Sequence, residues 1–65
     1  MPDFEIRMLN DTEVGIVAMT ERAQLGRRIA PGHTLAFKSS GEAREFVDVA
    51  EAEGYTFGGR ENLGT

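Results

Sequence analysis

The side chains best suited to chemistry are carboxylates gathered between residues 42 and 53. The acids of this stretch are Glu42, Glu45, Asp48, Glu51 and Glu53, and Arg44 is its only base. Acid–base catalysis by paired carboxylates needs two groups in different environments, one of them shielded from water. The spacing here instead places the acids at outward positions of a helix. We therefore expect a solvated, negatively charged surface rather than a catalytic centre.

Nucleophilic catalysis has little support in the remaining residues. The chain has no cysteine, and its single histidine, His33, follows a Pro-Gly turn signal at residues 31–32. A hydrolytic triad would need His33 beside Ser39 or Ser40, and we interpret His33 as a solvated turn residue. Residues 58–60 (Gly-Gly-Arg) lack the length and the lysine of a phosphate-binding loop. We expect no enzyme activity, no cofactor and no metal.

Composition predicts one small globular domain. The 65 residues are 40% hydrophobic and 28% charged, which is ordinary for a folded protein. We expect a single domain over residues 1–58 and a flexible, glycine-rich tail over residues 59–65. No uncharged stretch approaches the roughly 20 residues of a membrane span. Asp3 and Glu5 stand where a secretory signal would carry lysines, so we expect a cytoplasmic protein without membrane contact.

The net charge of −4 is unevenly distributed along the chain. Residues 1–20 contain four acids and one base, and residues 41–65 contain six acids and two bases. Residues 21–40 reverse this balance, with Arg22, Arg27, Arg28 and Lys38 against Glu21. Such asymmetry can steer association with a charged partner.

Hydrophobic periodicity predicts strands in the first half of the chain. Residues 4–8 alternate apolar and charged side chains, residues 10–13 have turn chemistry, and residues 14–19 are rich in β-branched residues. These segments predict a hairpin. Residues 20–32 stay open between a helical turn capped by Thr20 and closed by Gly26, an extended connection and an edge strand. Residues 33–38 predict a third strand.

The clearest predicted element is a helix that follows this third strand. Ser39 and Glu42 fit the capping box, and Gly54 is suited to the left-handed conformation that ends a helix. The apolar face of the helix consists of Ala43, Phe46, Val47 and Ala50. Residues 55–57 predict a short last strand. The order is β-β-β-α-β, an α+β fold in which one amphipathic helix packs on a mainly antiparallel sheet of three to four strands.

The acidic helix face is the predicted partner-binding surface. It consists of Glu42, Glu45, Asp48, Val49, Glu51 and Glu53. Carboxylates three or four residues apart on a helix lie about 5–6 Å from each other, close to the phosphate spacing of one DNA strand. Val49 projects among the acids and would serve as a small apolar anchor. The competing interpretation is a solvated face, with Arg44 paired to Asp48.

Small size, acidity and absence of cysteine give this chain a resemblance to the phage-encoded inhibitors called anti-CRISPR proteins. The resemblance covers the whole chain as size and charge pattern, without a shared motif. It implies an inhibitor that competes with DNA for the basic, nucleic-acid-binding surface of a partner protein. We expect such an inhibitor to act as a monomer or weak homodimer.

Two alternatives remain open. Direct nucleic-acid binding would use the basic segment 22–38 together with Tyr55, since residues 54–57 (Gly-Tyr-Thr-Phe) resemble part of the aromatic signature of RNA-recognition-motif domains. Glu53 stands where that signature has a base, and the pI of about 4.8 disfavours nucleic acid as the partner. The other alternative is an accessory or antitoxin-like subunit that binds a protein.

Overall fold

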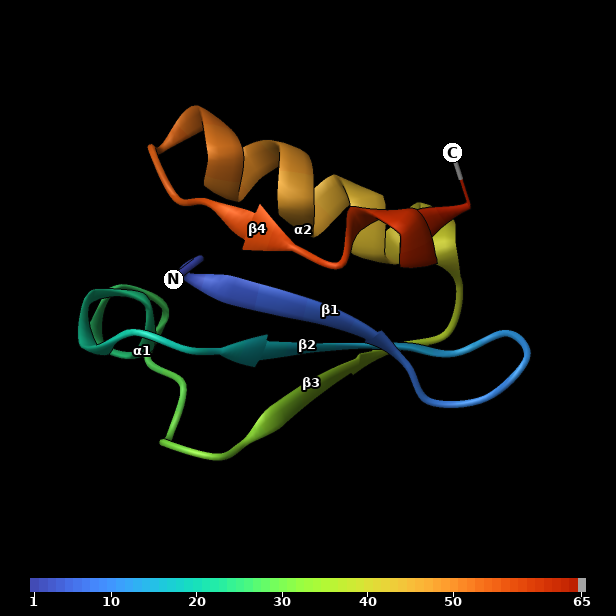
Figure 1. Cartoon of the computed structure of the whole chain (residues 1–65), viewed down its shortest axis with the longest axis horizontal. Coiled ribbons are helices and arrows are strands. Elements are labelled where there is room, and N and C mark those ends of the chain that lie inside the picture. The colour runs from blue at the N-terminus through green and yellow to red at the C-terminus, as the bar shows by residue number, and fades with distance from the viewer. Residues whose placement is uncertain (65) are drawn as a thin grey trace.

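A four-stranded sheet covered on one face by a long helix forms the body of the protein (Figure 1). The computed structural model describes residues 1–64. The elements in chain order are β1 (Phe4–Met8), β2 (Val14–Ala18), α1 (Glu21–Arg27), β3 (Thr34–Phe37), α2 (Ser40–Ala52), β4 (Phe57–Gly58) and the 3₁₀ helix η1 (Arg60–Leu63). The predicted α+β class is confirmed, and α1 adds a second helix to the one expected.

The strands lie in the order β3-β2-β1-β4. β1 and β2 form the predicted antiparallel hairpin, and β3 pairs antiparallel with β2. Asn10 closes the hairpin turn because its side-chain oxygen accepts from the backbone N–H groups of Thr12 (3.0 Å) and Glu13 (2.8 Å). β4 pairs parallel with β1, as expected for a strand reached through a crossover helix.

The helix α2 begins with the predicted cap. The Ser39 hydroxyl accepts from the N–H of Glu42 at 3.3 Å. The Glu42 carboxylate accepts from the N–H of Lys38 (3.0 Å), one residue earlier than in the standard capping box. At the other end, Gly54 takes the left-handed conformation (φ 96°) as predicted.

The core lies between the sheet and α2. From the sheet it contains Phe4, Ile6, Val14, Ile16 and Ala18, and from α2 it contains Ala43 and Val47. Phe4 is its aromatic centre, stacked on Phe57 with 4.9 Å between ring centroids and edge-on to Phe46 at 5.6 Å. The predicted apolar faces of β2 and α2 are therefore the buried ones.

Residues 20–28 form a capped helix, which is one of the alternatives that the sequence left open. Thr20 caps α1, but Gly26 does not end it. The helix continues to Arg27, and Arg28 takes the left-handed conformation (φ 55°, ψ 44°) instead. Gly26 has a tertiary role instead, because a Cβ there would lie 1.9 Å from the Tyr55 hydroxyl and would displace that side chain.

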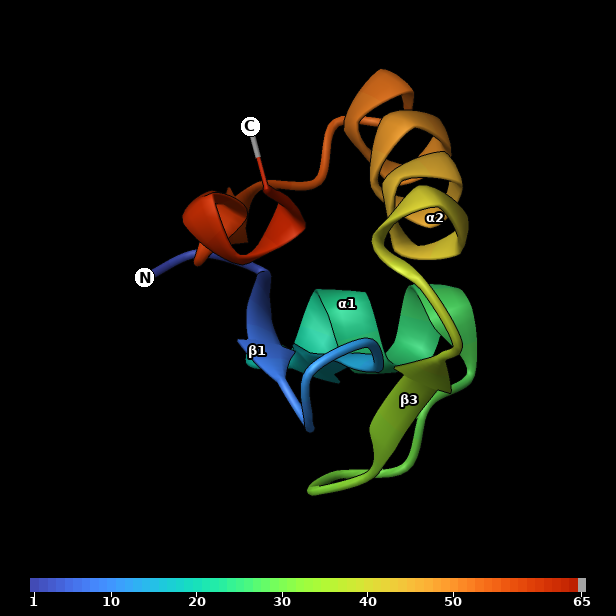
Figure 2. The same ribbon diagram turned by 90° about the vertical axis from the view of Figure 1, so that its right-hand side faces the viewer.

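The structure also differs from the flexible tail expected over residues 59–65. Arg60–Leu63 form η1, which lies beside α2 over the sheet (Figure 2). Leu63 is only 3% exposed, and the Asn62 side chain donates to the carbonyl of Ile6 at 2.8 Å. The mostly polar composition of this segment predicted a flexible tail, but its one apolar side chain, Leu63, packs into the core. Thr65 lies outside the described residues.

None of the helices within residues 1–64 combines the length and the apolar character needed to cross a membrane.

Candidate functional site

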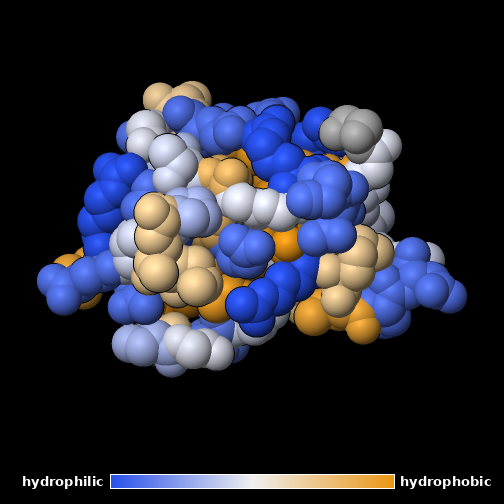
Figure 3. Space-filling view, in the orientation of Figure 1, coloured by the Kyte–Doolittle hydropathy of each residue, from blue (hydrophilic) through white to orange (hydrophobic). Residues whose placement is uncertain are grey.

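All six residues predicted to bind a partner are exposed along α2 and its C-cap. They are Glu42, Glu45, Asp48, Val49, Glu51 and Glu53. Val49, in the middle of α2, is 55% exposed. In the orientation of Figure 3, the surface over α2 along the top of the view is mostly hydrophilic. The structure therefore places the predicted residues on one accessible helix.

Three of these acids are engaged within the chain. Glu51 pairs with Arg60 of η1 at 2.5 Å, and Glu53 pairs with Arg27 of α1 at 2.6 Å. Glu42 caps α2 through the backbone of Lys38. These contacts hold the two flanks of α2 to neighbouring elements. The charges of Glu51 and Glu53 are thus partly neutralised before any partner arrives.

Glu45 and Asp48 remain, with Val49 beside them. Within residues 1–64 neither carboxylate forms an ion pair. Arg44 does not pair with Asp48 as the sequence suggested, because its guanidinium donates to the carbonyl of Leu63 at 3.3 Å. We call Glu45, Asp48 and Val49 the outer acidic face.

Some bases of the segment 22–38 also form ion pairs within the chain. The first of them is Arg22, which pairs with Asp3. The Asp3 side chain is almost fully buried and accepts from Thr20 Oγ1 (2.6 Å), from Arg22 Nε (2.9 Å) and from the backbone N–H of Thr56 (3.0 Å). The Arg22 guanidinium, together with the Thr20 hydroxyl, holds the pKa of Asp3 well below its usual range, and this pairing in turn raises the pKa of Arg22. Arg22 is therefore a structural cation.

Arg27 is held by aromatic rings as well as by Glu53. Its guanidinium lies 5.4 Å from the centroid of Phe46 and 5.7 Å from that of Tyr55, a cation–π arrangement. Within residues 1–64 Arg28 and Lys38 are the two bases of the segment that form no ion pair. The positive charge available to a partner is thus smaller than the sequence suggests.

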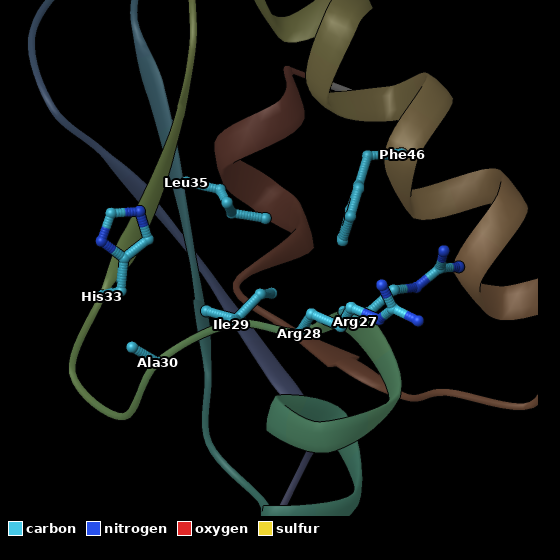
Figure 4. A pocket seen from close by; sticks show the side chains of 7 residues that line it. All are labelled: Arg27, Arg28, Ile29, Ala30, His33, Leu35 and Phe46. Carbon is cyan, nitrogen blue, oxygen red and sulfur yellow. The ribbon is translucent and has the colours of Figure 1, made fainter.

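A groove of about 480 Å³ lies between α2, β3 and the connection that follows α1 (Figure 4). Its apolar lining comes from Ile29, Leu35 and Phe46. Leu35 and Phe46 point toward one another across the groove in Figure 4. Arg27, Arg28, Ala30 and His33 complete the lining. Nothing in the residue spacing predicted this groove, because Ile29 and Phe46 meet only in the folded chain.

The two aromatic residues of the possible RNA-binding signature face the helix side of the sheet. Phe57 stacks on Phe4, and Tyr55 packs edge-on against the same ring with 5.5 Å between centroids. Arg22 lies 5.0 Å from the Tyr55 centroid. Their rings are occupied by core and cation contacts, so they do not form an exposed base-stacking platform.

The residues considered for catalysis are separated in their roles. Ser39 caps α2, whereas His33 is exposed at the rim of the groove. Within the part of the chain that the structure describes, no three histidine, aspartate or glutamate side chains are grouped so that they could hold a metal ion.

Comparison of the chain with protein-family models, with curated proteins and with solved structures finds no match.

Proposed function

We propose that this chain is a non-enzymatic inhibitor of the anti-CRISPR kind, which uses the outer acidic face of α2 to occupy a basic, nucleic-acid-binding surface of a partner protein. The observation that carries the proposal is the exposure of Glu45 and Asp48 without an intramolecular cation in residues 1–64. The inhibitor would act in the cytoplasm as a monomer or weak homodimer.

The geometry of α2 suits such an encounter. Glu45 and Asp48 are three residues apart on one helix, so their side chains leave the same side with Cβ atoms about 5–6 Å apart. A partner's arginine side chains, arranged to hold successive phosphates, would meet charges at a similar interval. Val49 adds apolar contact area at the border of the two charges.

The proposed surface is narrower than the one predicted from sequence. Glu51 and Glu53 contribute to the negative field, but Arg60 and Arg27 already pair with them. A partner arginine would have to compete with those internal cations. We therefore assign the binding energy mainly to Glu45, Asp48 and Val49, with Glu42 as a flanking charge.

Reversal of both outer charges tests the proposal. We expect Glu45→Lys/Asp48→Lys to recover a bacterial partner at least about tenfold less efficiently than the wild type, because each reversal turns an attraction into a repulsion. The measurement is a pull-down of the tagged chain from bacterial lysate at low and high salt, with partners identified by mass spectrometry. Wild-type binding should weaken as salt rises.

The matched control is Asp11→Lys/Glu21→Lys, which changes the net charge equally at exposed sites outside α2 and η1. It should retain the partner. Equal recovery by both double variants would contradict the proposal. A partner without any nucleic-acid-binding surface would instead favour an accessory or antitoxin-like role.

Direct nucleic-acid binding has less support as a function. Arg22 and Arg27 are paired within the chain, and the ring of Tyr55 packs on Phe4. A mobility-shift assay with bare DNA and RNA at low salt distinguishes this alternative, for which a clear shift is required.

A further inference from the structure

A second surface, which carries bases rather than acids, lies where β3 forms an edge of the sheet. Met19, which directly follows β2, donates its N–H to the Asp3 carbonyl at 2.7 Å. Odd-numbered residues of β2 therefore direct their backbone groups toward β1. Because the direction of the backbone groups alternates along an antiparallel strand, the N–H and C=O groups of Ile16 point toward β3, where its register partner is Leu35. Leu35 therefore uses its backbone groups to bond β2.

The neighbours of Leu35 in β3 direct their backbone groups the other way. The N–H and C=O groups of Thr34 and Ala36 point to the outer edge, and within residues 1–64 no hydrogen bond from this edge to another element involves them. Lys38 N–H continues the same row and is accepted by Glu42, which closes the edge at that end. An open row of this kind can pair with an added strand.

The groove lies beside this open edge. A strand added to β3 would direct every second side chain to the face that carries Leu35, and thus toward the space between Leu35 and Phe46 (Figure 4). A volume of about 480 Å³ accommodates apolar side chains of such a strand. Strand addition with alternate side chains in a pocket is an established mode of peptide recognition.

Arg28 at the rim indicates the charge of the occupant. Its left-handed backbone ends α1, where its N–H donates to the carbonyls of Gln24 and Leu25. Within residues 1–64 its side chain forms no ion pair. His33 lies on the same rim, and Lys38 ends the same edge. The rim thus carries an unpaired cation in a protein with a net charge of −4.

We propose that this groove binds an extended, acidic peptide segment of a protein partner, which adds to the edge of β3 and places an apolar side chain between Leu35 and Phe46. Charge complementarity with Arg28 selects this occupant. A second copy of the chain fits less well, because pairing two β3 edges would bring together the same basic residues. The site is separate from the outer acidic face.

A labelled model peptide tests this proposal directly. The probe is a short fluorescein-labelled peptide in which glutamate and valine alternate around a central leucine; a second probe has lysine in place of glutamate. We expect the acidic probe alone to bind, measured by fluorescence anisotropy. In nuclear magnetic resonance spectra it should shift the amide signals of Thr34 and Ala36 and the methyl signals of Leu35.

Two variants separate binding from folding. Arg28→Gly removes the guanidinium but suits the left-handed conformation, so its melting temperature should not fall while probe affinity falls about tenfold. Ala36→Pro removes one outward N–H at an edge position, where proline is tolerated, and should weaken the probe similarly. Arg7→Gln, at an exposed residue of β1, is the control with unchanged affinity.

Several outcomes would overturn the proposal. They are the absence of acidic-probe binding at millimolar concentration, affinity unaffected by Arg28→Gly and Ala36→Pro, preferential binding of an oligonucleotide at the same residues, and formation of a dimer through β3 instead. The Glu45→Lys/Asp48→Lys variant should bind the probe like the wild type. Failure at this groove is therefore distinguishable from failure at the outer acidic face.

Discussion

Gly59→Ala is expected to destabilise the protein by about 3 kcal/mol or more, which approaches the whole stability of a domain this small. Gly59 has φ 78°, where a side chain costs on the order of 1–2 kcal/mol. An added Cβ would also lie 2.2 Å from the backbone carbonyl oxygen of Ile6, which a rotamer change cannot relieve. Thermal and urea unfolding followed by circular dichroism measures the effect.

Gly32→Ala provides the matched control. Gly32 has nearly the same backbone conformation (φ 80°), but an added Cβ would meet no atom within 4 Å. Its substitution should cost only about 1–2 kcal/mol, from backbone strain alone. Equal stability losses in the two variants would show that the contact between residue 59 and β1 has no energetic role.

The second large effect is expected at Asp3, whose carboxylate joins β1 to α1 and β4. Asp3→Asn keeps the shape but replaces one acceptor oxygen with an NH₂ group, which then faces the donors either of Thr20 and Arg22 or of Arg22 and Thr56. Donors left without an acceptor in a buried site are strongly destabilising. We expect the melting temperature to fall by about 10 °C or more.

The same substitution has a specific pH dependence. Because Arg22 lowers the pKa of Asp3 in the folded protein, the stabilisation is complete above the ordinary aspartate pKa of about 4 and disappears as the pH falls toward the folded-state pKa. The difference in melting temperature between wild type and Asp3→Asn should therefore narrow below about pH 4. Asp11→Asn, at an exposed turn residue, is the control and should melt close to the wild type. A pH-independent difference would contradict this account.

The Asp3 network also bears on both proposed surfaces. Thr20 caps α1 while its hydroxyl donates to Asp3, and Arg22 of α1 donates to the carbonyl of Gly54 at 2.9 Å. Asp3 thereby fixes α1 against the C-terminal end of α2. Arg28, at the end of α1, and the groove beside it depend on that placement. A variant at Asp3 that still folds should lose probe binding as well as stability.

The internal ion pairs explain why a strongly charged helix leaves only a small free surface. Arg27 and Arg60 approach α2 from α1 and η1 and pair with Glu53 and Glu51. Exposed ion pairs of this kind contribute little to stability, at most about 1 kcal/mol each. Their larger effect is on recognition, because they remove charge from the flanks of α2 and concentrate it at Glu45 and Asp48.

Local patterns determined the hairpin, the helix α2 and the part of the core that these elements contribute. The turn at Asn10, the cap at Ser39 and the left-handed Gly54 all act through contacts within a few residues. The apolar periodicity of β2 and α2 likewise identified their buried faces. Such features are readable because the physical cause and its effect lie close together in the chain.

Tertiary structure alone decided the role of Gly26, the packing of residues 60–63, the burial of Asp3 and the pairing of the charges. Asp3 and Thr56 are 53 positions apart, and Arg27 and Glu53 are 26 apart. Gly26 looked like a helix stop, yet it makes room for Tyr55. The sequence shows which residues carry charge, but which of these charges form ion pairs depends on how the sheet, α1 and α2 come together in space. The charged surface that is available to a partner consists of the residues that these internal contacts do not engage.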